Sequence, residues 1–329
     1  MIRYIFKRIL TIIPVVLAVA IVVFTVMYFS PGNPAEIILG TGASQESIEQ
    51  LEKQLGIDQP YLVQLGRFMF STFIKFDLGN SYANNLSISA ELANRFPKTL
   101  MLALFAIILE LIIGIPLGMI AAIKRNKLAD QLCMLFALIG VSAPAFWLGI
   151  ELILLFSSRL HWLPSSGVVS WKGWILPIIL VSLRGIAQMA RQSRSSMLEV
   201  INSDYVVTGR AKGLKESEIM FKYALSNALI PLVQTAGNSF ASSLGGAVVI
   251  ESLFSIPGIG QYMVQAVRVR DYAVIRGTVV VLSIAFCLIM MIVDIVFAFI
   301  DPRIMAQYSG RSAKAKYRAK RRREARANG

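Results

Sequence analysis

The sequence predicts an all-α membrane protein that crosses the bilayer six times. Hydrophobic residues make up 56% of the 329 residues and charged residues 16%, whereas a soluble domain has about 45–50% and about 25%. Six stretches also have the length and apolar composition of membrane-spanning helices, each of which needs about 20 residues. A soluble globular fold and a disordered chain are both excluded.

The few cysteine and histidine residues exclude several kinds of functional site. Cys133 and Cys287 both lie in apolar stretches, where cysteine acts as a small core residue, so we expect no disulfide framework. His161 is the only histidine in the sequence. A histidine-based metal site and a catalytic triad containing histidine therefore cannot be built within this chain.

The first apolar stretch, residues 9–29, follows Arg3, Lys7 and Arg8. It is too long for the hydrophobic part of a signal peptide, and residues 30–34 make a poor cleavage site, so we interpret it as a span. The fourth span is short and the fifth only weakly apolar. The five spans after the first are expected near residues 99–123, 131–157, 174–190, 229–250 and 277–300.

Positive charges predict the orientation of the spans. If the N-terminus is cytoplasmic, the cytoplasmic segments hold 23 of the 33 Lys and Arg residues. Cytoplasmic loops are enriched in these residues, so both termini are predicted to be cytoplasmic. Residues 303–329 alone carry ten cations and one acid, Glu324. We expect a disordered basic tail at 306–329 that is attracted to anionic lipid and does not bind nucleic acid.

The spans divide the chain into four parts. Residues 1–30 form the cytoplasmic N-terminus and the first span, 31–97 an extracytoplasmic helical segment, 98–305 a core of five spans, and 306–329 the tail.

The segment 31–97 is predicted to contain two amphipathic helices. Ser44 is expected to cap the first helix and Gly56 to end it. The second helix is expected at 61–76, followed by a turn at 77–81. This segment is either a structural lid over the external mouth or a docking site for a partner.

The cytoplasmic segment 191–228 has room for two helices and a turn. Ser196 is expected to cap one helix, with Glu199 completing a capping box. Gly213 is expected to end the helix that carries residues 208–212, and residues 215–225 form the next helix. The result is a knob whose tip presents Leu214 to a partner's cleft. An ordinary cytoplasmic loop is the alternative.

The fifth span is too polar to face lipid on all sides. Its small, hydroxyl and amide side chains either allow close helix packing or line a wet pathway. If there is a pathway, the residues expected to face it are Asn238, Ser239, Ser242 and Gly246.

Three carboxylates fall inside predicted spans: Glu110, Glu151 and Asp294. An ionisable group there costs about 2.5–3.5 kcal/mol on insertion scales, so each needs a reason to be present. They are candidates for the translocation path, and the alternative is a protonated or paired structural group.

The most specific pattern in the chain is RQSRSSMLEV at 191–200, followed by DY at 204–205 and TGRAKGL at 208–214. This pattern closely resembles the cytoplasmic loop of ATP-binding-cassette (ABC) importer permeases of the dipeptide, oligopeptide and nickel branch. Weaker matches follow in the expected order across about residues 1–305: PGNP at 31–34, DLGNS at 77–81, HWLP at 161–164, ESLFSIPGIG at 251–260, RDY at 270–272 and DPR at 301–303.

The resemblance implies the type I ABC importer permease fold and, from the long segment between the first two spans, a B-type permease. It implies as partners a second homologous permease subunit, two ABC ATPase subunits and an extracytoplasmic substrate-binding protein. The residues expected to couple to an ATPase are Thr208, Gly209, Arg210, Ala211, Lys212, Gly213 and Leu214.

ATP and Mg²⁺ are expected in the partner ATPases. This chain lacks the Gly-x-x-x-x-Gly-Lys-[Ser/Thr] phosphate loop, so we expect no cofactor, no metal and no enzymatic activity in it.

The sequence thus predicts a permease in the bacterial plasma membrane that forms half of a path for dipeptides or oligopeptides. Alternating access would be driven by the partner ATPases. Nickel or a metal chelate is the alternative cargo. A stand-alone proton-coupled carrier that uses the three carboxylates is the alternative from another class, and a membrane enzyme is less favoured.

Overall fold

A computed structural model describes residues 2–40 and 42–300, so the predicted tail and the DPR motif lie outside the described residues. This part of the chain is helical, and its only β pairing is an isolated bridge between Asn80 and Ser87. The α-helices are α1 (Ile2–Tyr28), α2 (Pro34–Leu39), α3 (Gln45–Leu55), α4 (Tyr61–Phe73), α5 (Ile88–Ile123), α6 (Leu128–Ser142), α7 (Ala145–Leu152), α8 (Lys172–Ile201), α9 (Asp204–Ala211), α10 (Glu216–Glu218), α11 (Leu225–Gly246), α12 (Val248–Leu253), α13 (Ile259–Arg268) and α14 (Tyr272–Ile300). Two π-helical segments, η1 (Ile153–Arg159) and η2 (Ile219–Ala224), continue α7 and α10.

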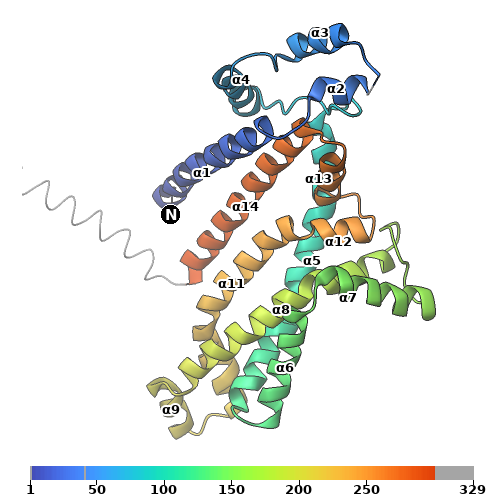
Figure 1. The fold of residues 1–329 in the computed structure, drawn as a ribbon. Helices are drawn as coiled ribbons and strands as arrows, with labels where there is room; N and C mark the ends of the chain where they lie inside the picture. Colours follow the sequence, from blue (N-terminus) through green and yellow to red (C-terminus); the bar gives the residue numbers. More distant parts are fainter. Residues whose placement is uncertain (1, 41, 301–329) are drawn as a thin grey trace, which may run out of the picture.

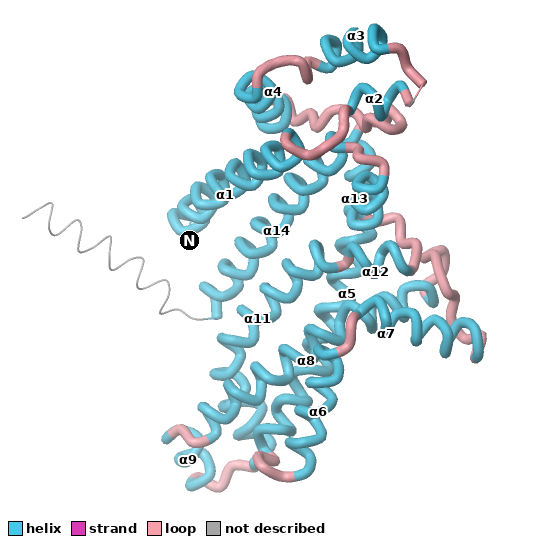
Figure 2. The backbone as a smooth tube through the Cα atoms, in the orientation of Figure 1, coloured by secondary structure: helices cyan, strands magenta, loops and turns pink. Residues whose placement is uncertain are grey.

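The helices form an elongated bundle (Figure 1, Figure 2). Helices α2, α3 and α4 gather at one end and α9 lies at the other. Helix α5 runs between these ends, and α8 runs from the middle of the bundle, near α7 and α12, to α9. α1 packs along α14, α5 packs against α8, and α11 contacts α5, α8 and α14. Buried apolar side chains hold these pairs together: Ala20 and Val280 join α1 to α14, and Leu102 and Leu176 join α5 to α8.

Four helical stretches have the length and hydropathy of membrane spans: Arg8–Tyr28, Ile88–Ile123, Lys172–Ile201 and Tyr272–Val296. The pair α6 and α7–η1 makes a fifth if it is counted as one broken span. The predicted fifth span corresponds mainly to α11, which is less apolar and does not meet the same criterion. The polytopic all-helical class is confirmed, and the count of six with both termini cytoplasmic stays a prediction.

The third span differs from the straight helix expected at 131–157. α6 ends at Ser142, α7 begins at Ala145, and the two helices are bent by 97°. Ala143 between them has extended dihedral angles, φ −82° and ψ 137°. A residue that precedes proline is pushed out of the helical region by the proline ring, and Pro144 follows here. The proline therefore breaks the span.

Two other helices are longer than the spans predicted in them. α5 begins at Ile88, eleven residues before the expected start, so the end of the segment 31–97 is helical and continuous with the membrane helix. α8 runs unbroken to Ile201, so Ser196 lies inside a helix and the capping box predicted there is wrong. In both helices the apolar residues of the predicted span and the polar residues beyond it belong to one continuous helix.

The predicted ends of the first helix in the segment 31–97 are confirmed. The Ser44 hydroxyl oxygen accepts a hydrogen bond from the backbone N–H of Ser47 and caps α3. Gly56 ends α3 in the left-handed conformation, φ 67° and ψ 30°. α4 ends at Phe73, three residues earlier than expected, and α2 is an additional short helix capped by Asn33.

Buried hydrogen bonds tie the segment 31–97 to the start of α14. Ser81 donates to the Asp271 carboxylate at 2.6 Å, and the backbone N–H of Ala83 donates to the same oxygen at 3.2 Å. The Tyr272 hydroxyl donates to the carbonyl oxygen of Pro31 at 2.6 Å. The PGNP, DLGNS and RDY motifs therefore meet at one joint.

The ESLFSIPGIG motif forms a second buried joint. Glu251, fully buried on α12, accepts hydrogen bonds from the Thr99 hydroxyl on α5 at 2.6 Å and from the backbone N–H of Gln261 on α13 at 3.0 Å. A Cβ atom at Gly258 would lie 2.4 Å from a Glu251 oxygen, and one at Gly260 would lie 2.6 Å from Val248. A side chain at Gly260 would therefore collide with the α12 backbone, and one at Gly258 would displace the Glu251 carboxylate from its hydrogen bonds.

Candidate functional site

A cavity of about 330 Å³, the central cavity, lies between α5, α8 and α11. Its polar lining comes from one acidic, one basic and several amide or hydroxyl side chains. The residues that line it are Glu110, Ala145, Leu180, Val181, Arg184, Gly185, Gln188, Asn238, Ser239, Ser242, Ser243 and Ile250. Pockets with a few convergent polar groups are typical of ligand-binding sites.

Glu110 is the acidic group of the central cavity. It lies on α5 with 1% of its surface exposed, and its carboxylate accepts a hydrogen bond from the Ser239 hydroxyl on α11 at 2.5 Å. The facing residue on α8 is Gly185, where a Cβ atom would lie 1.9 Å from the Glu110 carboxyl carbon. Glycine at 185 therefore makes the space that the carboxylate occupies.

The cavity brings together four of the predicted path residues: Glu110, Asn238, Ser239 and Ser242. Gly246 is the last residue of α11. Glu151 is exposed on α7, outside the cavity lining.

Asp294 occupies a different place from the other two carboxylates. It lies on α14 and forms an ion pair with Arg8 on α1. Because α1 and α14 pack along one another, this ion pair links two spans. Asp294 is not among the residues that line the central cavity.

Sequence reasoning missed the α8 side of the cavity, where Arg184 and Gln188 lie. Arg184 falls within the predicted fourth span, 174–190, and was not among the predicted path residues. Their spacing of four residues places both polar side chains on one helix face. This spacing was the feature of the sequence that could have indicated a polar face on the fourth span.

The α9 knob consists of residues 204–224, which are α9, the turn at Gly213, α10 and η2. The predicted helix end is confirmed, because α9 stops at Ala211 and Gly213 has φ 74°. Val206, Gly209 and Ile219 are buried in the knob. The knob packs on the ends of α5 and α8 through an apolar cluster that includes Met119, Met197, Val206 and Ile219.

Two ion pairs brace this end of the molecule. Arg210 Nη2 donates a hydrogen bond to Glu216 Oε1 at 2.7 Å across the knob's turn, and this hydrogen bond holds the pKa of Glu216 below the usual range. Arg194 on α8 binds both carboxylate oxygens of Asp130 on α6 at 2.7 and 2.8 Å. Bidentate pairs of this kind fix orientation as well as adding energy.

The apolar surface of the knob differs from the prediction. Leu214 is half-buried and packs on the apolar cluster of the knob, so it does not project from the tip as expected. The large apolar side chains that are exposed on the knob are those of Tyr205, Val207, Phe221 and Tyr223, of which Phe221 is 64% exposed. Thr208, Arg210, Ala211, Lys212 and Gly213 are exposed, whereas Gly209 is buried.

Apolar helices around a polar cavity, with a helical knob beyond their ends, define a membrane permease. The family model described as binding-protein-dependent transport system inner membrane component matches residues 114–306, and the model for the N-terminal part of such membrane components matches residues 1–103. The chain belongs to this family of ABC importer permeases. It is therefore a multi-pass inner-membrane subunit and is not itself the ATPase.

Similar proteins cover nearly the whole chain. A Brucella suis protein named as a peptide transport system permease is 42% identical over 308 residues, which are 91% of this chain and 98% of that protein. The glutathione transport system permease protein GsiC of Escherichia coli is 40% identical over 304 residues, which are 92% of this chain and 99% of that protein.

Solved structures show the same fold. Two inward-facing structures of the MetNI methionine ABC transporter match with TM-scores of 0.53 and 0.55 at 19% and 20% identity. Each match covers 64% of this chain and 96% of the solved chain. The type I importer permease fold predicted from the sequence is confirmed.

Proposed function

We propose that this chain forms half of the translocation path of an ATP-driven importer for dipeptides or oligopeptides. The names of its relatives support peptide as the cargo. The central cavity supports it independently, because Glu110 and Arg184 offer a carboxylate and a guanidinium to the two charged ends of a peptide. Asn238, Ser239 and Ser242 add hydrogen-bonding groups along α11.

The assembly that we propose has five components: this chain, a second homologous permease, two ABC ATPases that bind ATP and Mg²⁺, and an extracytoplasmic binding protein. The α9 knob docks on one ATPase. Residues 208–214 carry this role, together with the exposed side chains of Tyr205, Val207 and Phe221. The apolar packing of the knob on α5 and α8 supports rigid-body transmission of ATPase closure to the spans.

Nickel or a metal chelate is a less favoured cargo. Among residues 2–40 and 42–300, no three His, Cys, Asp or Glu side chains come together as metal ligands. A metal chelate could still be recognised through its organic part, so the transport assay described next includes a nickel–histidine complex as a competitor.

The cavity assignment predicts that Glu110→Gln impairs transport. Uptake of labelled trialanine into vesicles that contain the whole complex should fall about tenfold or more, because a hydrogen bond to a charged group contributes about 1.5–3 kcal/mol. Gln keeps the shape of the side chain and a partner for Ser239.

The matched control is Glu151→Gln, which removes a carboxylate from an exposed position outside the cavity lining. This variant should transport like the wild type. Equal uptake by the Glu110→Gln variant and the wild type, or competition by the nickel complex but not by unlabelled peptide, would contradict the proposed path and cargo.

A further inference from the structure

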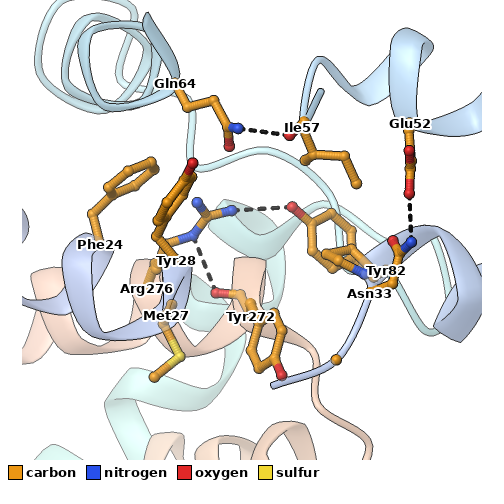
Figure 3. A pocket seen from close by; sticks show the side chains of 12 residues that line it. Phe24, Met27, Tyr28, Asn33, Glu52, Ile57, Gln64, Tyr82, Tyr272 and Arg276 are labelled. Atoms are coloured by element: carbon orange, nitrogen blue, oxygen red, sulfur yellow. Dashed lines mark hydrogen bonds between the residues drawn. The ribbon is translucent and has the colours of Figure 1, made fainter. Parts of the chain in front are cut away.

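A second pocket, the outer pocket, lies at the end of the molecule opposite the α9 knob (Figure 1, Figure 3). It has a volume of about 390 Å³ and lies between the end of α1, the start of α14 and the segment 31–97. It shares no lining residue with the central cavity. Its volume falls in the range of about 300–1,000 Å³ that is typical of small-molecule sites.

A guanidinium group is held in fixed orientation on one side of the outer pocket. Arg276 on α14 donates from Nη2 to the Tyr82 hydroxyl at 3.0 Å and from Nε to the carbonyl oxygen of Tyr272 at 3.3 Å. It also lies over the rings of Phe24 and Phe68, with centroids 5.2 and 5.4 Å away. The side chain therefore needs little reorganisation to bind a ligand.

This guanidinium lacks an acidic partner in the described part of the chain. The ion pairs found there do not include Arg276, which is half-buried. Its Nη1 group has no hydrogen-bond acceptor among the described side chains and backbone. A half-buried, oriented guanidinium with free donors is a strong site for a carboxylate or a phosphate.

The opposite side of the outer pocket carries a carboxylate (Figure 3). Glu52 on α3 is half-buried and accepts a hydrogen bond from the Asn33 amide at 2.5 Å. It takes part in no ion pair within residues 2–40 and 42–300. The ring of Tyr82 lies between the two charged groups in Figure 3, and Tyr28 lines the pocket on the other side of Arg276. Aromatic faces attract ammonium groups.

We propose that the outer pocket binds a small zwitterion, with its oxyanion on Arg276 and its ammonium group beside Glu52. Two sources carry this chemistry: a peptide with free termini and the headgroup of an ethanolamine phospholipid. The peptide source rests on the proposed function, whereas the zwitterion site follows from the pocket itself.

The site is tested by equilibrium binding of labelled trialanine to the whole complex without its binding protein, in the uncharged detergent dodecyl maltoside. In the wild type, N-acetyl-trialanine and trialanine amide should each compete at least tenfold more weakly than trialanine. This comparison needs no variant, so a folding defect cannot imitate it.

Variants then assign the binding to the outer pocket. Arg276→Gln should weaken the binding at least tenfold, and Glu52→Gln should abolish the discrimination against N-acetyl-trialanine. The matched control Arg268→Gln removes an exposed arginine at the end of nearby α13 and should leave binding unchanged. Trialanine binding must persist in Glu110→Gln, because Glu110 lines the central cavity and not the outer pocket. The result therefore distinguishes a wrong assignment of the transport path from a wrong assignment of this binding site.

The lipid source is tested on complexes extracted from vesicles that contain phosphatidylethanolamine. Native mass spectrometry should find this lipid bound to the wild type and absent from Arg276→Gln if the headgroup is the occupant. The proposal is overturned if the blocked peptides compete as well as trialanine and phosphatidylethanolamine is retained equally by the wild type, Arg276→Gln and Glu52→Gln.

Discussion

Glu110 and Asp294 are carboxylates inside long apolar helices, and their neighbours give them different roles. Glu110 accepts a hydrogen bond from Ser239 and lines the central cavity, whereas Asp294 is paired with Arg8 on α1. The sequence identifies both groups as costly in a membrane, but it does not reveal their partners. Arg8 and Asp294 are 286 positions apart, and only the packing of α1 on α14 brings them together.

The Arg8–Asp294 pair predicts a non-additive mutational cycle. Arg8→Gln or Asp294→Asn alone should lower the free energy of unfolding by about 1–3 kcal/mol, because each leaves a charge without its partner. The double variant should lose less than the sum, with a coupling energy of about 0.5–3 kcal/mol. Thermal unfolding of the detergent-solubilised complex measures the cycle.

Transport provides the second readout of this cycle. Uptake of trialanine per assembled complex should stay within about twofold of wild type in all three variants, because the pair lies outside the central cavity. Strictly additive losses of stability, or loss of uptake in Asp294→Asn with normal assembly, would contradict the structural role.

The central-cavity residues on α11 could be predicted because hydroxyl and amide groups are rare in a membrane helix. Asn238, Ser239 and Ser242 were found in this way. Arg184 was not, because an arginine near a span end also fits a charge that fixes orientation. The role of Gly185 depends on the position of Glu110 on a different helix, so no local pattern contains it.

Helix α8 connects the central cavity to the α9 knob as one rigid element. It carries Arg184 and Gln188 in the cavity and continues unbroken to Ile201. Arg194, one turn beyond the span predicted from the sequence, is clamped to Asp130 at the start of α6. The pair therefore ties α6 to α8 at the end of the bundle where the knob packs.

This clamp predicts a specific dependence of stability on pH. The Arg194 guanidinium holds the pKa of Asp130 below its usual value of 3.8. A lowered pKa in the folded state means that the stabilisation is complete above pH 3.8 and is lost as the pH falls through the lowered value. At pH 7, Asp130→Asn should lower the free energy of unfolding by about 1–3 kcal/mol.

The difference in free energy of unfolding between the wild type and Asp130→Asn should shrink as the pH falls below 3.8, because the unfolded-state carboxylate then binds a proton while the folded one stays ionised down to its lowered pKa. Unfolding followed by tryptophan fluorescence between pH 7 and pH 3 measures it. Glu199→Gln is the control, because Glu199 is exposed on α8, the helix that carries Arg194, and should show no such effect. If the difference in free energy of unfolding between the wild type and Asp130→Asn stays constant from pH 7 to pH 3, the Arg194–Asp130 pair does not stabilise the fold as described.

The turn of the α9 knob predicts a coupling defect. Gly213 has φ 74°, and placing a side chain in the left-handed region costs about 1–2 kcal/mol. Gly213→Val should therefore distort the knob and reduce substrate-stimulated ATP hydrolysis by the complex at least fivefold. The control is Gly79→Val, which has a similar φ of 79° and open space around it but lies far from the knob. If a normally assembled Gly213→Val complex keeps its full substrate-stimulated ATP hydrolysis, the knob has no role in coupling.

Helix boundaries were predictable wherever a local residue sets them. Ser44, Gly56 and Gly213 act within one turn of their own position, and each was placed correctly. The break at Pro144 was missed because the apolar run continues through it. The extension of α5 back to Ile88 was missed because it depends on packing against α13 and α14, which are distant in sequence.

At the scale of the whole molecule, the helices that line the outer pocket, those that line the central cavity and those of the α9 knob follow one another along the bundle (Figure 2). The outer pocket is at the end where α2, α3 and α4 gather, the central cavity lies between α5, α8 and α11, and the α9 knob is at the far end. The long helices α5, α8 and α14 connect them. This order suits a subunit that receives cargo at one end and energy at the other.

The central claim is that transport through this chain is driven by ATP hydrolysis in separate subunits. Uptake of labelled trialanine into proteoliposomes tests it most directly, measured for the purified chain alone and for the complete complex. We predict no uptake by the chain alone under a proton gradient, and uptake by the complex that requires ATP and the binding protein. Proton-driven uptake by the chain alone would contradict the account and favour a stand-alone carrier.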